Sequence, residues 1–142
     1  MRMKIALWLP RTADSVTVAR HVLERTLGSF GVHRDCREEI ALAVSEACSN
    51  VVRHADGADM YHLAAESSDD QCTVEVNDDG PGLTEPELAE MPAVGRPGGR
   101  GFPLMRQLSD RVEVRRRSSG GLSVRLSKRL RWHPGAPGRA CS

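Results

Sequence analysis

Hydrophobic and polar residues follow two different periods along the chain. Alternation with a period of two predicts strands over residues 3–9, 61–66, 72–76, 112–114 and 122–126. Apolar positions at helical spacing predict helices over about 15–30, 35–54 and 103–108. Because the strands come in hairpin pairs and the helices cluster, the pattern predicts an α+β fold. We expect a two-layer α/β sandwich, with a mixed, mostly antiparallel sheet and helices on one face.

Capping residues set the expected helix ends. Asp14 or Ser15 can cap the first helix, and Gly28 and Gly31 can end it. Asp35, with Glu38 three residues later, resembles a capping box and is the expected N-cap of the second helix.

Residues 80–103 differ in composition from the rest of the chain. They hold six of the thirteen glycines and five of the eight prolines. A long loop of this kind inside a domain is often functional. We therefore expect one domain over residues 1–130 with a lid at about 83–101, a short helical piece near 85–91, and a disordered tail over 131–142.

Composition and charge narrow the function classes. The chain is 39% hydrophobic and 27% charged, its four cysteines form no CxxC pair, and no apolar run approaches a membrane span. These features favour a soluble protein of the reducing cytoplasm, without a membrane partner. Residues 1–110 carry 11 basic and 18 acidic side chains, whereas residues 111–142 carry nine and one. A basic end can indicate binding to nucleic acid, but with only two Phe, one Tyr and two Trp the chain has no platform on which bases could stack. We therefore explain the basic C-terminal end as the charged outer faces of surface strands.

The second predicted helix has a polar side that carries candidate chemistry. A helical wheel places Glu46 and Asn50, one turn apart, opposite the apolar side, with His54 at the edge. An ordinary solvated face would explain this pattern, but asparagine has a low helix propensity and needs a reason in mid-helix. A carboxylate and an amide oxygen side by side could hold a hard cation such as Mg²⁺.

Two glycine-rich segments follow. Asp78-Asp79-Gly80-Pro81-Gly82 comes directly off a predicted strand, where a carboxylate can accept a hydrogen bond from an exocyclic amine and glycines allow a flat ligand to approach. Gly99-Arg100-Gly101-Phe102 precedes a predicted helix, and such a helix N-terminus can bind an anion. The alternative explanation for residues 78–82 is a simple turn, and for residues 99–102 it is a connecting loop whose arginine has no role. The P-loop pattern is absent.

The three blocks, in this order, resemble the Bergerat-fold ATPases, which include histidine-kinase catalytic domains, gyrase B, the Hsp90 chaperones and MutL. Residues 46–55, EACSNVVRHA, resemble the E-x-x-x-N-x-x-x-H block. Residues 78–82 resemble the D-x-G-x-G block, and residues 99–102 the G-x-G-[LF] block. Within this group, the chain most resembles the anti-sigma factor serine/threonine kinases of the RsbW and SpoIIAB type. The features that carry this likeness are the chain length, the His-Ala ending of the first block and residues 101–112.

This resemblance implies roles for individual residues. Asn50 would hold Mg²⁺ and Glu46 would be the general base. Asp78 would bind the adenine amine of ATP, above a floor shaped by Gly80 and Gly82. The phosphates would be cradled by a last group, which consists of Gly99, Arg100, Gly101 and Phe102. His54 is a family feature that can equally be structural.

The resemblance also implies a function. The chain would bind a bacterial sigma factor and phosphorylate Ser or Thr of an anti-anti-sigma antagonist of the STAS type, with ATP and Mg²⁺ as cofactors and homodimerisation allowed. The alternative is a nucleotide-binding module of the same fold that acts by partner binding alone.

Overall fold

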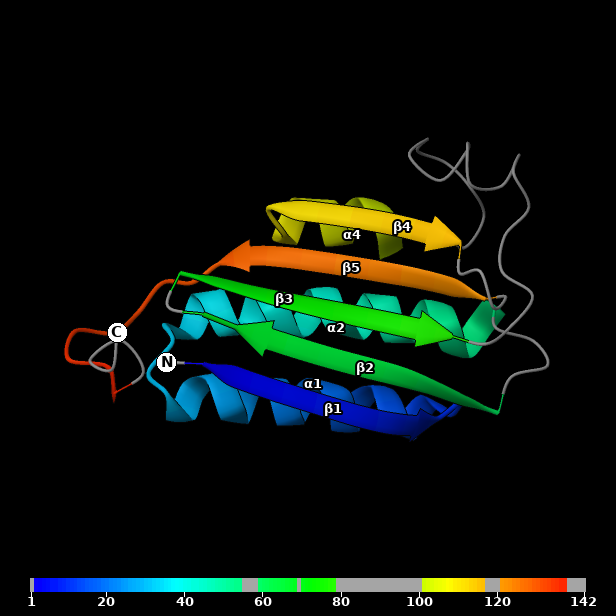
Figure 1. Cartoon of the computed structure of the whole chain (residues 1–142), viewed down its shortest axis with the longest axis horizontal. Coiled ribbons are helices and arrows are strands. Elements are labelled where there is room, and N and C mark those ends of the chain that lie inside the picture. The colour runs from blue at the N-terminus through cyan, green and yellow to red at the C-terminus, as the bar shows by residue number, and fades with distance from the viewer. Residues whose placement is uncertain (1, 55–58, 69, 79–100, 117–120, 138–142) are drawn as a thin grey trace.

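The chain folds into a five-stranded sheet with helices on one face (Figure 1). The structure is a computed structural model that describes residues 2–54, 59–68, 70–78, 101–116 and 121–137. Its elements, in chain order, are β1 (Met3–Pro10), α1 (Ala13–Ser29), α2 (Arg34–His54), β2 (Met60–Ser67), β3 (Gln71–Asp78), α4 (Gly101–Leu108), β4 (Arg111–Arg116) and β5 (Leu122–Arg129). The predicted strands and helices are confirmed. The predicted helical piece near 85–91 lies outside the described residues.

The sheet has the strand order β1-β2-β3-β5-β4. Each neighbouring pair of described strands is antiparallel, so the prediction of a mixed sheet is wrong for this part of the chain. The reason is the β4–β5 hairpin, which inserts β5 between β3 and β4. Strands β3 and β4 run in the same direction but are not neighbours.

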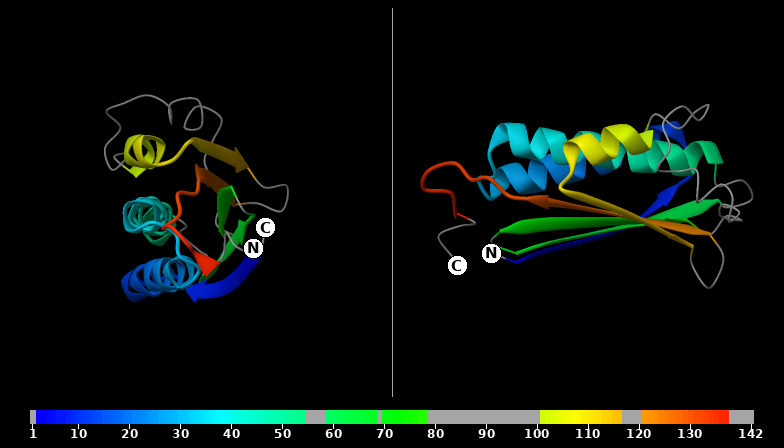
Figure 2. Two further views of the ribbon diagram at one scale, coloured as in Figure 1. Left: turned by 90° about the vertical axis from the view of Figure 1, so that its left-hand side faces the viewer. Right: turned by 90° about the horizontal axis from the view of Figure 1, so that it is seen from above.

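The helices form a second layer in which α2 is central (Figure 2). Alternate residues of β2 and β3 point at this layer and are buried, as the alternation predicts. Helix α2 lies between α1 and α4, and it buries more of its circumference than the apolar stripe that the helical wheel predicts, which consists of Ile40, Val44, Ala47, Cys48, Val51 and Ala55. Its buried residues beyond that stripe include Cys36, Ala41, Ala43, Ser45 and Asn50. No helix in the described ranges is long and apolar enough to cross a membrane.

The turn from α1 to α2 shows how the helix ends are fixed. The N–H of Gly31 donates to the carbonyl of Gly28, and the N–H of Val32 donates to that of Leu27, which is a Schellman motif with Gly31 at φ +90°. Helix α2 then begins one residue earlier than expected. The predicted N-cap role of Asp35 is wrong, because His33 Nδ1 accepts the Asp35 N–H at 3.2 Å and performs the capping itself.

Residues 131–137 lie against this turn. Trp132 forms a β-bridge with Val32, the His133 N–H donates to the Gly31 carbonyl, and Ala136 is buried. The composition predicts a disordered tail from residue 131, and through residue 137 that prediction is wrong. Residues 138–142 lie outside the described part of the chain.

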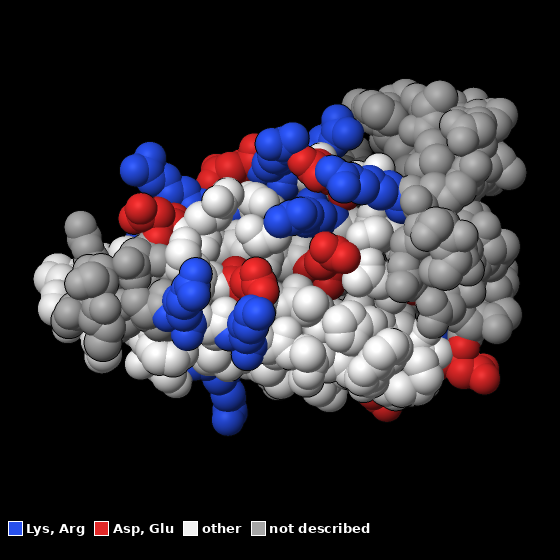
Figure 3. Space-filling view, viewed as in Figure 1, with Lys and Arg blue, Asp and Glu red and all other residues white. Residues whose placement is uncertain are grey.

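The open face of the sheet carries the charged side chains of β4 and β5 (Figure 3). Glu113 accepts from Arg111 at 2.7 Å and from Arg115 at 3.1 Å, and it is opposite Arg125 in the register. The basic end of the sequence therefore includes the outward faces of two paired strands, as predicted.

A partly buried lysine ties α4 to α2 and to the sheet. Lys128 Nζ, on β5, lies 2.6 Å from Glu39 Oε2 and 2.6 Å from the carbonyl oxygen of Leu108, the last residue of α4. Arg131 donates to the other Glu39 oxygen at 2.9 Å. The hydrogen bond from Lys128 is the main reason that the pKa of Glu39 lies below its usual range, and the charge of Arg131 adds to the effect.

Replacing this carboxylate should change the acid stability of the protein. A folded-state pKa below the unfolded value contributes stability above the unfolded pKa, about 4.3 for glutamate, and this is lost as the pH falls through the folded value. We expect Glu39→Gln to lower the free energy of unfolding at neutral pH, and the difference from wild type to shrink in acid. Urea unfolding over a series of pH values measures this difference in the free energy of unfolding. The control is Glu66→Gln, which removes the carboxylate of an exposed ion pair with Lys4. If the difference in the free energy of unfolding stays constant as the pH falls, the ionised Glu39 carboxylate does not have the stabilising role assigned to it.

Candidate functional site

The described residues of the three predicted motifs lie at one end of the molecule. The C-terminal ends of α2 and β3 and the N-terminal end of α4 lie at the same end of the sandwich (Figures 1 and 2). These segments carry Glu46 and Asn50, Asp78, and Gly101 with Phe102. Motifs that are far apart in the sequence are therefore brought to one edge of the fold.

Asn50 is the polar residue of α2 that departs most from a solvated face. It is only 8% exposed, although the helical wheel places it opposite the apolar side. Its Oδ1 accepts a hydrogen bond from the Arg53 guanidinium at 2.8 Å, while its buried Nδ2 has no hydrogen-bond partner among the described residues. A buried amide donor without a partner costs free energy, so its retention points to a ligand that supplies an acceptor.

Glu46 lies one turn before Asn50 on α2 and is partly exposed. A carboxylate in this position is accessible and is held on a rigid helix beside the amide. Glu46 is therefore available to accept a proton from a group bound near Asn50.

Asp78, the last residue of β3, is 6% exposed. Its Oδ1 accepts from the N–H of Leu122 at 3.3 Å, where β5 begins. Gly121, at φ +84°, lies so close that an added Cβ would be 2.0 Å from the Asp78 carbonyl oxygen. Only glycine fits there, and the Leu122 N–H holds the Asp78 carboxylate from the neighbouring strand β5.

The remaining predicted residues are described only in part. Gly101 and Phe102 are the first two residues of α4, whose N-terminal N–H groups are unpaired within the helix and favour an anion. His54 is exposed and ends α2, beside Asn50 on the next turn. Gly80, Gly82, Gly99 and Arg100 lie outside the described residues.

The donor set fits Mg²⁺ bound together with a nucleotide. Within the described ranges, no group of three or more His, Cys, Asp or Glu side chains could hold a metal ion by itself. Mg²⁺ commonly takes one or two protein oxygens and completes its shell with water and phosphate oxygens. The Asn50 amide oxygen suits this role, and its unpartnered Nδ2 suits a phosphate acceptor.

Sequence reasoning missed three contributors to this site. On the sequence alone Arg53 has no assigned role, although its i,i+3 spacing from Asn50 predicts contact. Gly121 lies in no predicted element, and Leu122 only begins a predicted strand. Their contact with Asp78 joins residues more than forty positions apart, and no local pattern carries it.

Two of the described cysteines are unsuited to this chemistry. Cys48 and Cys72 are fully buried, and burial raises the pKa of each thiol to about 12. Thiols held protonated in this way are poor nucleophiles.

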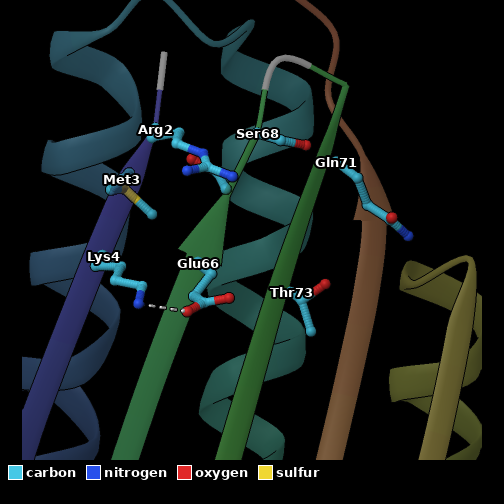
Figure 4. Close-up of a pocket in the computed structure, with 8 residues that line it drawn as sticks. Arg2, Met3, Lys4, Glu66, Ser68, Gln71 and Thr73 are labelled. Carbon is cyan, nitrogen blue, oxygen red and sulfur yellow. Dashed lines mark ion pairs between the residues drawn. The ribbon is translucent and has the colours of Figure 1, made fainter.

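A pocket of about 660 Å³ lies at the other end of the sheet (Figure 4). Arg2, Lys4, Glu66, Ser68, Gln71 and Thr73 are among its lining residues, and Lys4 pairs with Glu66 at 3.3 Å. Because Gln71 and Asp78 are the two ends of β3, the pocket is roughly 20 Å from the Asp78 site. It holds none of the predicted motif residues.

Curated relatives of the chain are named as anti-sigma factors and serine-protein kinases. An anti-sigma F factor from Pasteuria penetrans is 35% identical over 101 residues, which cover 65% of this chain and 67% of that protein. A serine-protein kinase RsbW from Staphylococcus epidermidis is 29% identical over 140 residues, covering 89% and 87%.

Solved structures share the fold. The RsbU and RsbW domains of Rv1364c from Mycobacterium tuberculosis give a TM-score of 0.70 at 20% identity, covering 90% of this chain and 32% of that one. The SiaB–SiaC complex from Pseudomonas aeruginosa gives 0.69 at 11% identity, covering 87% and 88%. At these identities the likeness is one of architecture.

The histidine kinase-like ATPase domain profile matches residues 9–128, a range that includes every residue predicted for the site. The resemblance indicated by the three sequence blocks is thereby confirmed, and the chain belongs to the histidine kinase-like ATPase domain family.

Proposed function

We propose that the chain is an anti-sigma regulatory factor that binds ATP with Mg²⁺ and phosphorylates Ser or Thr of an antagonist of the STAS type. Phosphorylation would free the factor from its antagonist and leave it bound to a sigma factor in the bacterial cytoplasm, where transcription takes place. The observation that carries the proposal is the buried Asn50 amide with its unpartnered donor, at the same end of the fold as Asp78. The relatives named anti-sigma F factor and RsbW support the choice of substrate and partner.

Each residue has a distinct task in this mechanism. Asp78 accepts a hydrogen bond from the adenine exocyclic amine, and its own position is fixed by the Leu122 N–H. Asn50 would hold Mg²⁺, and the metal would neutralise charge on the phosphates. The N-terminus of α4 donates N–H groups to the phosphates. Glu46 accepts the proton of the substrate hydroxyl as it attacks the terminal phosphorus, and the leaving nucleotide departs as the diphosphate.

One observation favours the second candidate, a nucleotide-binding module without transfer. Residues 83–101, the predicted lid, contain no lysine. A lid without this point charge would rely on arginine and backbone N–H groups for the phosphates. Such a site can bind a nucleotide and leave its phosphates in place, so that regulation would rest on partner exchange.

Asn50→Ala tests the proposed cofactor site. The change removes the metal-binding oxygen and also the unpartnered buried donor, so the fold should keep its stability within about 1 kcal/mol. We expect calorimetry to show that the affinity for ATP in the presence of Mg²⁺ falls at least about tenfold, and that the loss in a chelator, where only the Nδ2 donor to phosphate is missing, is smaller. Unchanged affinity for the Mg²⁺ complex would show that Asn50 does not hold the metal.

A further inference from the structure

The metal-binding oxygen proposed for Asn50 already faces a cation. The Arg53 guanidinium, from the next turn of α2, donates to Asn50 Oδ1 at 2.8 Å. Arg53 itself is exposed, whereas the amide it contacts is buried. The side-chain oxygen of Asn50 is thus held by a positive charge, and the nitrogen of the same amide has no partner in the part of the chain that the structure describes.

Arg53 and Mg²⁺ cannot use this oxygen together without penalty. Mg²⁺ binds oxygen at about 2.0–2.1 Å and requires near-octahedral geometry around itself. A guanidinium donating to the same oxygen would be placed within a few ångströms of a divalent ion, where like charges repel strongly in a partly buried site. The guanidinium can move because its long side chain is exposed to solvent.

We infer that Arg53 competes with Mg²⁺ for the side-chain oxygen of Asn50. As a result, nucleotide binding depends less on the metal than it would if Asn50 had no contact with Arg53. This inference rests on the proposed function, since it concerns the same site. Without nucleotide, Arg53 orients the Asn50 side chain and satisfies its oxygen. When the metal complex binds, the Arg53 contact is broken, and the cost of breaking it is subtracted from the affinity for the Mg²⁺ form. Nucleotide that binds without metal leaves the contact intact and bears no such cost.

The test compares ATP affinity with and without metal in Arg53→Met. Methionine keeps the length and helix propensity of arginine but has neither charge nor donor. The measured quantity is the ratio of ATP affinity in saturating Mg²⁺ to that in a chelator, which cancels any general effect of the lost charge on the phosphates. We expect the ratio to rise about three- to tenfold. The rise is limited to this range because a hydrogen bond from an exposed arginine contributes less free energy than one from a buried arginine.

Two controls define the outcome. Arg20→Met, which removes an exposed arginine of α1, should leave the ratio unchanged. Lys at position 53 keeps the charge, so Arg53→Lys should give a ratio nearer to wild type than Arg53→Met does. A ratio that stays constant or falls in Arg53→Met overturns the inference, because Arg53 would then be neutral or would assist the metal.

A second readout separates failure of this inference from failure of the proposed function. In the nucleotide-free protein, the NMR signals of the Asn50 side-chain amide should shift in Arg53→Met and stay in place in Arg20→Met. Absence of that shift overturns the contact itself, whether or not ATP binds. A wild-type protein that shows the contact but binds ATP equally in Mg²⁺ and in chelator overturns the metal role of Asn50 and the competition with it.

Discussion

Glu46→Gln should reduce phosphate transfer by roughly 10²–10⁴-fold, the contribution of a general base, while ATP binding is preserved. Glutamine keeps the shape and helix propensity of glutamate but cannot accept the hydroxyl proton. The side chain is partly exposed, so stability should change by no more than about 0.5 kcal/mol. Transfer to the antagonist is measured at saturating ATP, and ATP affinity by calorimetry.

A matched control lies on the same helix. Glu38→Gln, two turns earlier, removes an exposed carboxylate that pairs with Arg34 and should leave transfer unchanged. Under the kinase proposal, antagonist stays unphosphorylated in the Glu46→Gln reaction and continues to capture the factor. A Glu46→Gln protein that transfers phosphate at the wild-type rate would return Glu46 to a solvated helix face.

Asp78→Asn should weaken ATP binding far more than GTP binding. The carboxylate is a charged acceptor for the adenine amine, and such a hydrogen bond is worth about 1.5–3 kcal/mol, or roughly ten- to a hundredfold in affinity. The asparagine oxygen can still accept from the Leu122 N–H, so the contact between β3 and β5 is retained. The affinities for ATP and GTP are measured side by side by calorimetry.

The result is interpreted against an exposed carboxylate. Asp14→Asn, in the first turn of α1, should leave both affinities unchanged. Equal losses of ATP and GTP affinity in Asp78→Asn would indicate a structural role for Asp78 at the β3–β5 junction instead of base recognition.

The elements of the fold were predictable because their periods are local. Alternation places Leu63 and Val74 on the covered face of the sheet, and both are buried there. The strand order was less accessible, since β5 inserts between β3 and β4 by a pairing that no single segment encodes. The capping role of His33 was missed because Asp35 has the stronger general preference for that position.

The sequence was sufficient to predict which residues form the candidate site, but not how deeply they are buried or what they contact. The helical wheel treats α2 as covered on one side, whereas α1 and α4 flank it, and Asn50 is buried as a result of tertiary packing. The same limit applies to Gly121, whose need for glycine comes from the backbone of Asp78. Residues 131–137 have the composition of a tail, but Trp132 and Ala136 provide enough apolar surface to hold them in place.

The most direct test of the central claim follows the terminal phosphate of ATP. The purified chain is incubated with Mg²⁺, ATP labelled in that phosphate and a STAS-type antagonist, and the labelled residue is identified by mass spectrometry. We predict phosphoserine or phosphothreonine on the antagonist, formed by wild type and strongly reduced in Glu46→Gln. Tight ATP binding with no label on any antagonist, or label only on histidine, would contradict the account.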